Sequence, residues 1–242
     1  MTTPLSETSP STRGRILAAL FLFVVACGIV AQAVIADAMV VLNDAGKTAA
    51  NILADKTLYR LAYAIFMVEM VAQIAVSAMF YDLLKPVNRS LARISAIIGI
   101  TGAGIKAFAR LFYYAPLILL SGLPYLSPLE PAQLAALSLS FIEINNQGAA
   151  IALIFFGFES LLQGWLIYRS EFLPRFLGVL SMVGGLGWLA YLWPPLGSQA
   201  FMAVALFAII GVIVTTGWLF IRGVDDAKWR ERAALAATSI WR

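Results

Sequence analysis

Six apolar runs, each long enough to cross a bilayer, constrain this chain more than any motif in it. They fall at about residues 16–37, 60–84, 91–120, 147–168, 175–193 and 200–221. A transmembrane helix needs roughly 20 mostly apolar residues, because it rises about 1.5 Å per residue through a hydrocarbon core about 30 Å thick. Hydrophobic residues make up 61% of the 242 residues, and charged residues only 12%. The sequence therefore predicts an all-α, polytopic transmembrane bundle of six helices.

The first apolar run has a second interpretation, as a secretory signal peptide. Arg13 and Arg15 resemble its basic start, and Ala36-Asp37-Ala38 resembles a cleavage site. The run is longer than the roughly 7–15 apolar residues of such a signal, so we favour a transmembrane helix. On this interpretation residues 1–12 form a disordered cytoplasmic tail, residues 13–222 the six-helix domain, and residues 223–242 a basic cytoplasmic tail.

The basic residues predict the orientation of the bundle. With six spans and a cytoplasmic N-terminus, the outer segments hold only Lys47, Lys56 and Arg60. Because Lys and Arg are enriched in cytoplasmic loops, we expect both termini in the cytoplasm. The same bias explains the net charge of +4 without a nucleic-acid partner. The inner segments hold Arg13, Arg15, Lys85, Arg89, Arg93, Arg169, Arg175, Arg222, Lys228, Arg230, Arg232 and Arg242.

Two connecting segments contain further predicted structure. The Ala-rich residues 45–54 favour a helix at the outer surface. Residues 132–144 read as a helical lead-in to the fourth span, followed by the polar residues Asn145-Asn146-Gln147-Gly148. We expect these four residues to cap, break or kink the helix, in preference to forming a binding element.

The third apolar run carries two cations, Lys106 and Arg110. Charged groups inside a bilayer are expensive, so other polar groups of the bundle are expected to face them. Glu69 and Glu159 are the candidate acids, because both interrupt other apolar runs. The candidate ligand-binding site comprises Glu69, Gln73, Lys106, Arg110, Glu159 and Gln163.

Helical rise places these residues at compatible depths. Glu69 and Lys106 lie roughly 20 Å from the cytoplasmic ends of their helices, and Glu159 about 15 Å from its own. Glu69, Gln73 and Ser77 share one helix face because they are spaced by four residues. We therefore expect Glu69 to face Lys106, with Glu159 in the same cluster. Both a structural role, in which the charges fix helix register, and a binding role remain open.

Three classes of function fit these patterns. The preferred class binds, or also transports, a small polar or amphiphilic molecule. The second is a structural or accessory subunit packing against another membrane protein or its own copy, through the small residues Ser95, Gly99, Ala103 and Ala107. An enzyme ranks last and we assign no catalytic residue, because the chain has no histidine and a single cysteine, Cys27. For the same reason we expect neither a metal nor another cofactor.

Seven sequence blocks occur together in this chain, at residues 49–54, 83–92, 155–157, 164–170, 172–178, 222–224 and 229–232. Together they resemble those of an uncharacterised bacterial membrane family, the domain of unknown function DUF4386. The resemblance implies a six-helix inner-membrane protein and no established activity. Where relatives show a histidine, this chain has Glu159, and where they show an arginine and an acid it has Gly99 and Gly102, so no family site residue is carried over.

Overall fold

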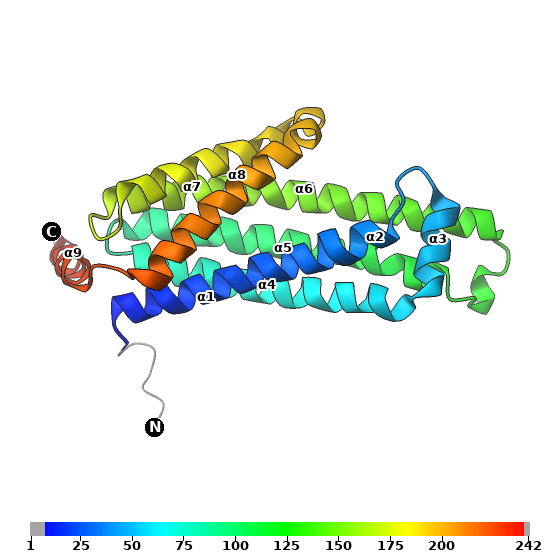
Figure 1. Ribbon diagram of the computed structural model, residues 1–242, viewed down its shortest axis with the longest axis horizontal. Helices are drawn as coiled ribbons and strands as arrows, with labels where there is room; N and C mark the ends of the chain where they lie inside the picture. Colours follow the sequence, from blue (N-terminus) through cyan, green and yellow to red (C-terminus); the bar gives the residue numbers. More distant parts are fainter. Residues whose placement is uncertain (1–7, 240–242) are drawn as a thin grey trace, which may run out of the picture. The chain divides into compact units, whose positions relative to one another are not determined.

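The computed structural model describes residues 8–239, and every regular element in that range is helical (Figure 1). Six stretches are long and apolar enough to cross a membrane, so the predicted all-α bundle with six such helices is confirmed. The elements are α1 (Pro10–Gly28), the π-helix η2 (Ile29–Ala36), α2 (Asp37–Met39), α3 (Ala45–Ala54), α4 (Lys56–Leu84), α5 (Arg89–Leu119), the 3-10 helix η3 (Pro124–Leu126), α6 (Pro131–Arg169), α7 (Arg175–Trp188), the 3-10 helix η4 (Leu189–Leu192), α8 (Pro194–Ile221) and α9 (Asp226–Ser239).

The chain divides into two compact units. Unit 1 contains Met1–Phe23, Ala72–Gly102 and Leu153–Arg242, and unit 2 contains Val24–Val71 and Ala103–Ala152. Helices α1, α4, α5 and α6 each contribute residues to both units. Each unit is described separately below.

Unit 2 has a core of apolar and aromatic side chains. Tyr59 and Phe66 from α4 and Tyr113 from α5 are fully buried in it, together with Ile52 from α3. The Tyr59 and Tyr113 rings stack at 4.3 Å, and the Tyr59 hydroxyl donates to the backbone carbonyl of Tyr113 over 2.7 Å. The buried tyrosine hydroxyl thus has an acceptor, and the pair ties α4 to α5.

Unit 1 packs its helices closely through glycine. Helices α7 and α8 run side by side (Figure 1). A Cβ atom on Gly164 of α6 would lie 2.6 Å from the carbonyl oxygen of Gly178 of α7, and one on Gly178 would lie 2.5 Å from that of Gly164. Only glycine at both positions lets these two helix backbones approach so closely.

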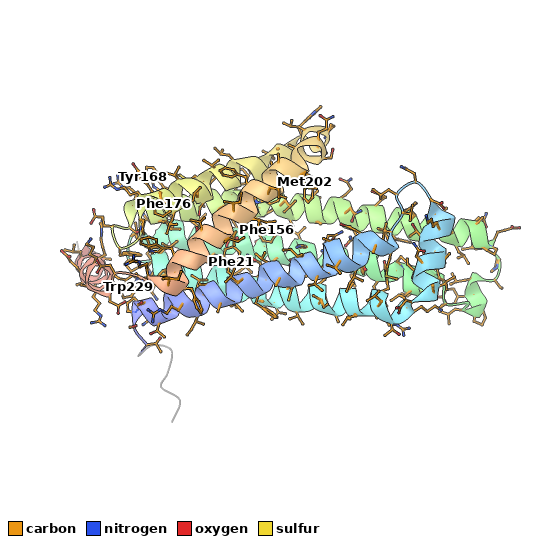
Figure 2. The ribbon with its side chains drawn as sticks, viewed as in Figure 1. Phe21, Phe156, Tyr168, Phe176, Met202 and Trp229 are labelled. Atoms are coloured by element: carbon orange, nitrogen blue, oxygen red, sulfur yellow. The ribbon has the colours of Figure 1, made fainter. Side chains whose placement is uncertain are left out.

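Helix α9 is joined to the ends of other helices in unit 1. Trp229, labelled in Figure 2, donates from its indole nitrogen to the carbonyl oxygen of Leu83 at the end of α4, over 2.9 Å. The Ser11 amide at the start of α1 donates to Asp226 over 2.7 Å. Arg232 lies 3.2 Å from Glu171, in the connection between α6 and α7. These contacts fix the helix found within the predicted basic tail.

Several predicted boundaries need correction. Helix α1 begins at Pro10, within the predicted tail, of which residues 1–7 lie outside the described range. The fourth span and its lead-in form one helix, α6, so residues 145–148 neither cap nor break it, and those two alternatives of the prediction are wrong. Helix α8 begins at Pro194, because proline suits the first helical turn. The short helix predicted over residues 45–54 is confirmed as α3.

Large apolar side chains also cover the outside of the described spans. Val71 in α4, Phe108 in α5 and Ile210 in α8 are more than half exposed. Such a surface is unfavourable in water and suited to lipid tails. Burial and composition together identify an integral, multi-pass membrane protein.

Candidate functional site

The predicted site residues fall into two polar clusters, one in each unit. Glu69, Lys106 and Arg110 belong to unit 2, together with Asn145, which sequence analysis had not included. The unit 1 cluster is formed by Ser77, Glu159 and Gln163. Gln73, also of unit 1, is buried with 8% of its surface exposed. Each cluster is described below within its own unit.

In unit 2, Lys106 and Glu69 form a buried ion pair. The Lys106 ammonium donates to Glu69 Oε1 over 2.7 Å, and the two side chains are 18% and 6% exposed. The pairing predicted from helical depth is confirmed. Charged hydrogen bonds of this length are among the strongest in proteins, but removing two charges from water offsets much of the gain.

Arg110 is the most deeply buried cation in unit 2, with 1% of its surface exposed. Its Nη1 donates to the side-chain oxygen of Asn145 in α6 over 3.1 Å. The guanidinium carbon lies 3.4 Å from the centre of the Phe66 ring, a cation–π contact. None of the four ion pairs found among the described residues includes Arg110. Its nearest partners are thus an amide and a ring.

Three buried polar atoms of these side chains have no hydrogen-bond partner among the described residues. They are Oε2 of Glu69, Nε of Arg110 and the hydroxyl of Tyr113. Leaving such an atom unsatisfied costs about 1–3 kcal/mol, more for a charged group. Unit 2 therefore presents two unused donors and one unused carboxylate oxygen beside its ion pair.

The first span lies against this cluster through Gly28. A Cβ atom at Gly28 would lie 3.2 Å from Glu69 Oε1, so the absence of a side chain gives the carboxylate its space. The π-helix η2 begins at the next residue, Ile29. π-helical turns are rare and frequently occur at functional sites. No sequence pattern used above predicts this turn.

The unit 1 cluster is arranged around Glu159, which is 4% exposed. Its Oε1 accepts hydrogen bonds from Ser77 over 2.7 Å and from Gln163 over 2.9 Å, and Ser95 donates to its backbone carbonyl over 3.3 Å. A Cβ atom on Gly99 would overlap the carboxyl group. These contacts join α4, α5 and α6 through neutral donors.

The same contacts show where part of the predicted small-residue stripe, Ser95, Gly99, Ala103 and Ala107, packs. Ser95 and Gly99 are buried against Glu159 of α6, and Ala103 is fully buried. Ala107 is half-buried. The stripe thus packs largely within the chain, whereas the accessory-subunit hypothesis called for an exposed one.

Signals for the missed residues were present in the sequence. Asn145 was interpreted as part of a helix break, although a buried arginine needs an acceptor and Asn145 lies in a neighbouring span. Ser77 was placed on the face of Glu69 and in fact hydrogen-bonds Glu159. The roles of Phe66 and Tyr113 could not be separated from ordinary core packing.

Comparison with known proteins identifies a family without an activity. The family described as "Domain of unknown function (DUF4386)" matches residues 16–223, so the chain belongs to this family. An "Uncharacterized protein" of Archaeoglobus fulgidus is 32% identical over 72 residues, which cover 29% of this chain and 43% of that protein. The chain thus spans less than half of this relative's length. No solved structure matches.

Proposed function

We propose that this member of the DUF4386 family binds a small amphiphilic molecule through an anionic group, at the unit 2 cluster of Glu69, Lys106 and Arg110. The observation that carries the proposal is the burial of Arg110 against an amide and a ring rather than a carboxylate. The cluster holds two cations and one carboxylate. It is therefore suited to accept one more negative charge.

The cost of burying the Arg110 charge favours a bound anionic ligand over compensation by the chain's own side chains alone. A buried cation without a matched anion is costly, since desolvation of one ion amounts to several kcal/mol. Glu69 is close enough to Arg110 to interact with it electrostatically, but its Oε1 already accepts a hydrogen bond from the Lys106 ammonium. A carboxylate or phosphate on a ligand would be attracted by both cations. Ionisable residues inside membranes commonly mark such binding sites.

The unused polar atoms indicate the chemistry of the ligand. Arg110 Nε and the Tyr113 hydroxyl can donate to an anionic oxygen, and Glu69 Oε2 can accept from a hydroxyl, an amine or a water molecule. The lipid-facing surface of the spans suits an alkyl chain attached to that group. An acidic amphiphile fits this combination better than a simple inorganic anion.

Thermal stability of the purified protein tests the proposal. Laurate, its neutral analogue dodecanol and acetate would be added to wild type, Arg110→Gln, and the control Arg60→Gln, which changes an exposed arginine of α4 in the same unit. We expect laurate to raise the melting temperature of wild type and Arg60→Gln but not of Arg110→Gln, while dodecanol and acetate have no such effect. Equal stabilisation of all three proteins by laurate contradicts the proposal. If Arg110→Gln does not fold, Lys106→Met, which removes the other cation of the cluster, takes its place in the comparison.

We also propose that the basic end of unit 1 faces the cytoplasm of a prokaryotic cell. The inner cations predicted above lie at the start of α1, in the turn from α4 to α5 and the first turns of α5, around the connection from α6 to α7, directly after α8, and in α9. Arg242 lies outside the described residues. The positive-inside rule assigns such segments to the cytoplasm. A reporter that is active only in the cytoplasm, fused to the C-terminus, would be active; its inactivity beside an active periplasmic reporter contradicts the assignment.

A further inference from the structure

A groove in unit 1 lies between the turn that joins α4 to α5 and the side of α9. It has a volume of about 890 Å³. Lys85 and Arg89 line it from the turn, and Trp229 and Arg232 line it from α9. The remaining lining residues are Tyr81, Pro86, Val87, Asn88, Ser90, Ala233, Leu235, Ala236 and Ala237. Three cations therefore line the groove, and no acidic side chain is among its lining residues. Lys85 pairs with Asp82 and Arg232 with Glu171, both outside that lining.

The groove has the position and the polarity of a lipid headgroup site. Helix α4 ends as a span at Leu84 and α5 begins at Arg89, so the turn between them lies where a span leaves the hydrocarbon. Arg89 and Ser90 open α5, whose N-terminal end carries partial positive charge. One wall is thus basic, and the alanines and Leu235 of α9 add apolar surface. This pairing matches a phosphate joined to an acyl chain.

Contacts from three other segments hold the α9 wall in place. Trp229 donates a hydrogen bond to the Leu83 carbonyl, and the guanidinium of Arg13 lies 5.7 Å from the centre of the Trp229 ring. The Asp225 amide, just before α9, donates to the Phe172 carbonyl over 3.3 Å. Arg232 pairs with Glu171 and donates to the Arg169 carbonyl over 3.3 Å. The α9 wall of the groove, with Arg232 on it, is therefore fixed by contacts within unit 1.

We infer that this groove binds the headgroup of an anionic phospholipid of the surrounding membrane. Arg89 and Arg232 contact the phosphate from opposite walls, and Trp229 lies at the level of the headgroup, as tryptophan does at membrane interfaces. The inference concerns unit 1 and does not depend on the site proposed in unit 2.

Lipid binding to the full chain in neutral-detergent micelles tests the inference. Dioleoyl phosphatidylglycerol, dioleoyl phosphatidylcholine and inorganic phosphate would be titrated separately, and bound lipid counted by native mass spectrometry. Arg89→Gln removes a groove cation, whereas Arg93→Gln, one turn further along α5, removes an exposed cation that does not line the groove. Ala233→Phe narrows the groove without changing its charge.

We expect wild type and Arg93→Gln to bind phosphatidylglycerol in preference to phosphatidylcholine. Arg89→Gln should weaken phosphatidylglycerol binding about fivefold, the factor for one lost basic contact near a membrane surface. Ala233→Phe should also weaken it. Equal losses in Arg89→Gln and Arg93→Gln would show diffuse attraction and overturn the inference. Equal binding of the two lipids, or competition by millimolar inorganic phosphate, would overturn it as well.

Discussion

Removing either charge of the Lys106–Glu69 pair tests the central contact of unit 2. Lys106→Met keeps an unbranched side chain that is one atom shorter, and Glu69→Gln keeps the shape of the glutamate side chain, while each removes one charge. Two unit charges 2.7 Å apart attract by about 6 kcal/mol at an effective dielectric constant of about 20. Desolvation of both groups offsets most of that attraction, so the net value of the pair is far smaller.

The single variants should nevertheless lose much more stability than the double variant. Removing one partner of a buried pair leaves the other uncompensated, which costs about 3–5 kcal/mol, whereas removing both is often close to neutral. Glu69→Gln should be the more damaging change, because it leaves two cations, Lys106 and Arg110, without their shared carboxylate. Lys106→Met leaves Glu69 beside Arg110 and should cost less.

Unfolding of the purified protein in mixed micelles measures these differences. For a chain of this size, about 3–5 kcal/mol corresponds to a fall in melting temperature of about 6–20 °C. The exposed pair Lys85–Asp82, at the same distance of 2.7 Å, is the control and should show a coupling energy below about 0.5 kcal/mol. Strictly additive losses for Lys106→Met and Glu69→Gln would refute the reasoning. A larger loss of stability in Lys106→Met than in Glu69→Gln would refute the argument that Glu69 offsets the charge of two cations.

Two further predictions concern packing in unit 1. Gly164→Ala should lower the free energy of unfolding by about 1–3 kcal/mol, because the new Cβ atom meets the Gly178 backbone. Gly217→Ala is the control, since a Cβ atom there has nothing within 4 Å, and in the same thermal assay it should leave stability unchanged or raise it by up to about 1 kcal/mol. An equal effect of both changes contradicts this account. Trp229→Phe removes the hydrogen bond to the Leu83 carbonyl, so it should lower the free energy of unfolding by about 1 kcal/mol and speed amide hydrogen exchange in α9. Unchanged exchange in α9 would show that this bond does not hold the helix.

The sequence predicted the spans and one of the site's contacts for a clear physical reason. Apolar length alone identifies a membrane helix, and a fixed rise per residue converts chain position into depth. Glu69 and Lys106 were assigned the same depth, and they pair. The prediction worked because both helix ends were located to within a few residues.

The partners of Glu159 and Arg110 could not be predicted in the same way. Depth does not specify which helix faces which, and hydroxyl and amide donors satisfy a carboxyl group as readily as a cation does. Glu159 therefore pairs with Ser77, two turns along α4 from Glu69, instead of with a lysine. Asn145 was interpreted by its local propensity to break helices. Its burial opposite Arg110 depends on tertiary packing, which overrides local propensity.

The difference between the two clusters explains why binding is proposed in unit 2. In unit 1, Oε1 of Glu159 accepts two hydrogen bonds from the chain itself, from Ser77 and Gln163. A buried polar group with such partners stabilises helix packing. In unit 2, the one carboxylate pairs with Lys106, while Arg110 is in no ion pair among the described residues, and unused donors remain on Arg110 and Tyr113. A stable bundle gains nothing from an unmatched cation inside a membrane. The excess positive charge is instead what a site for an anionic group requires.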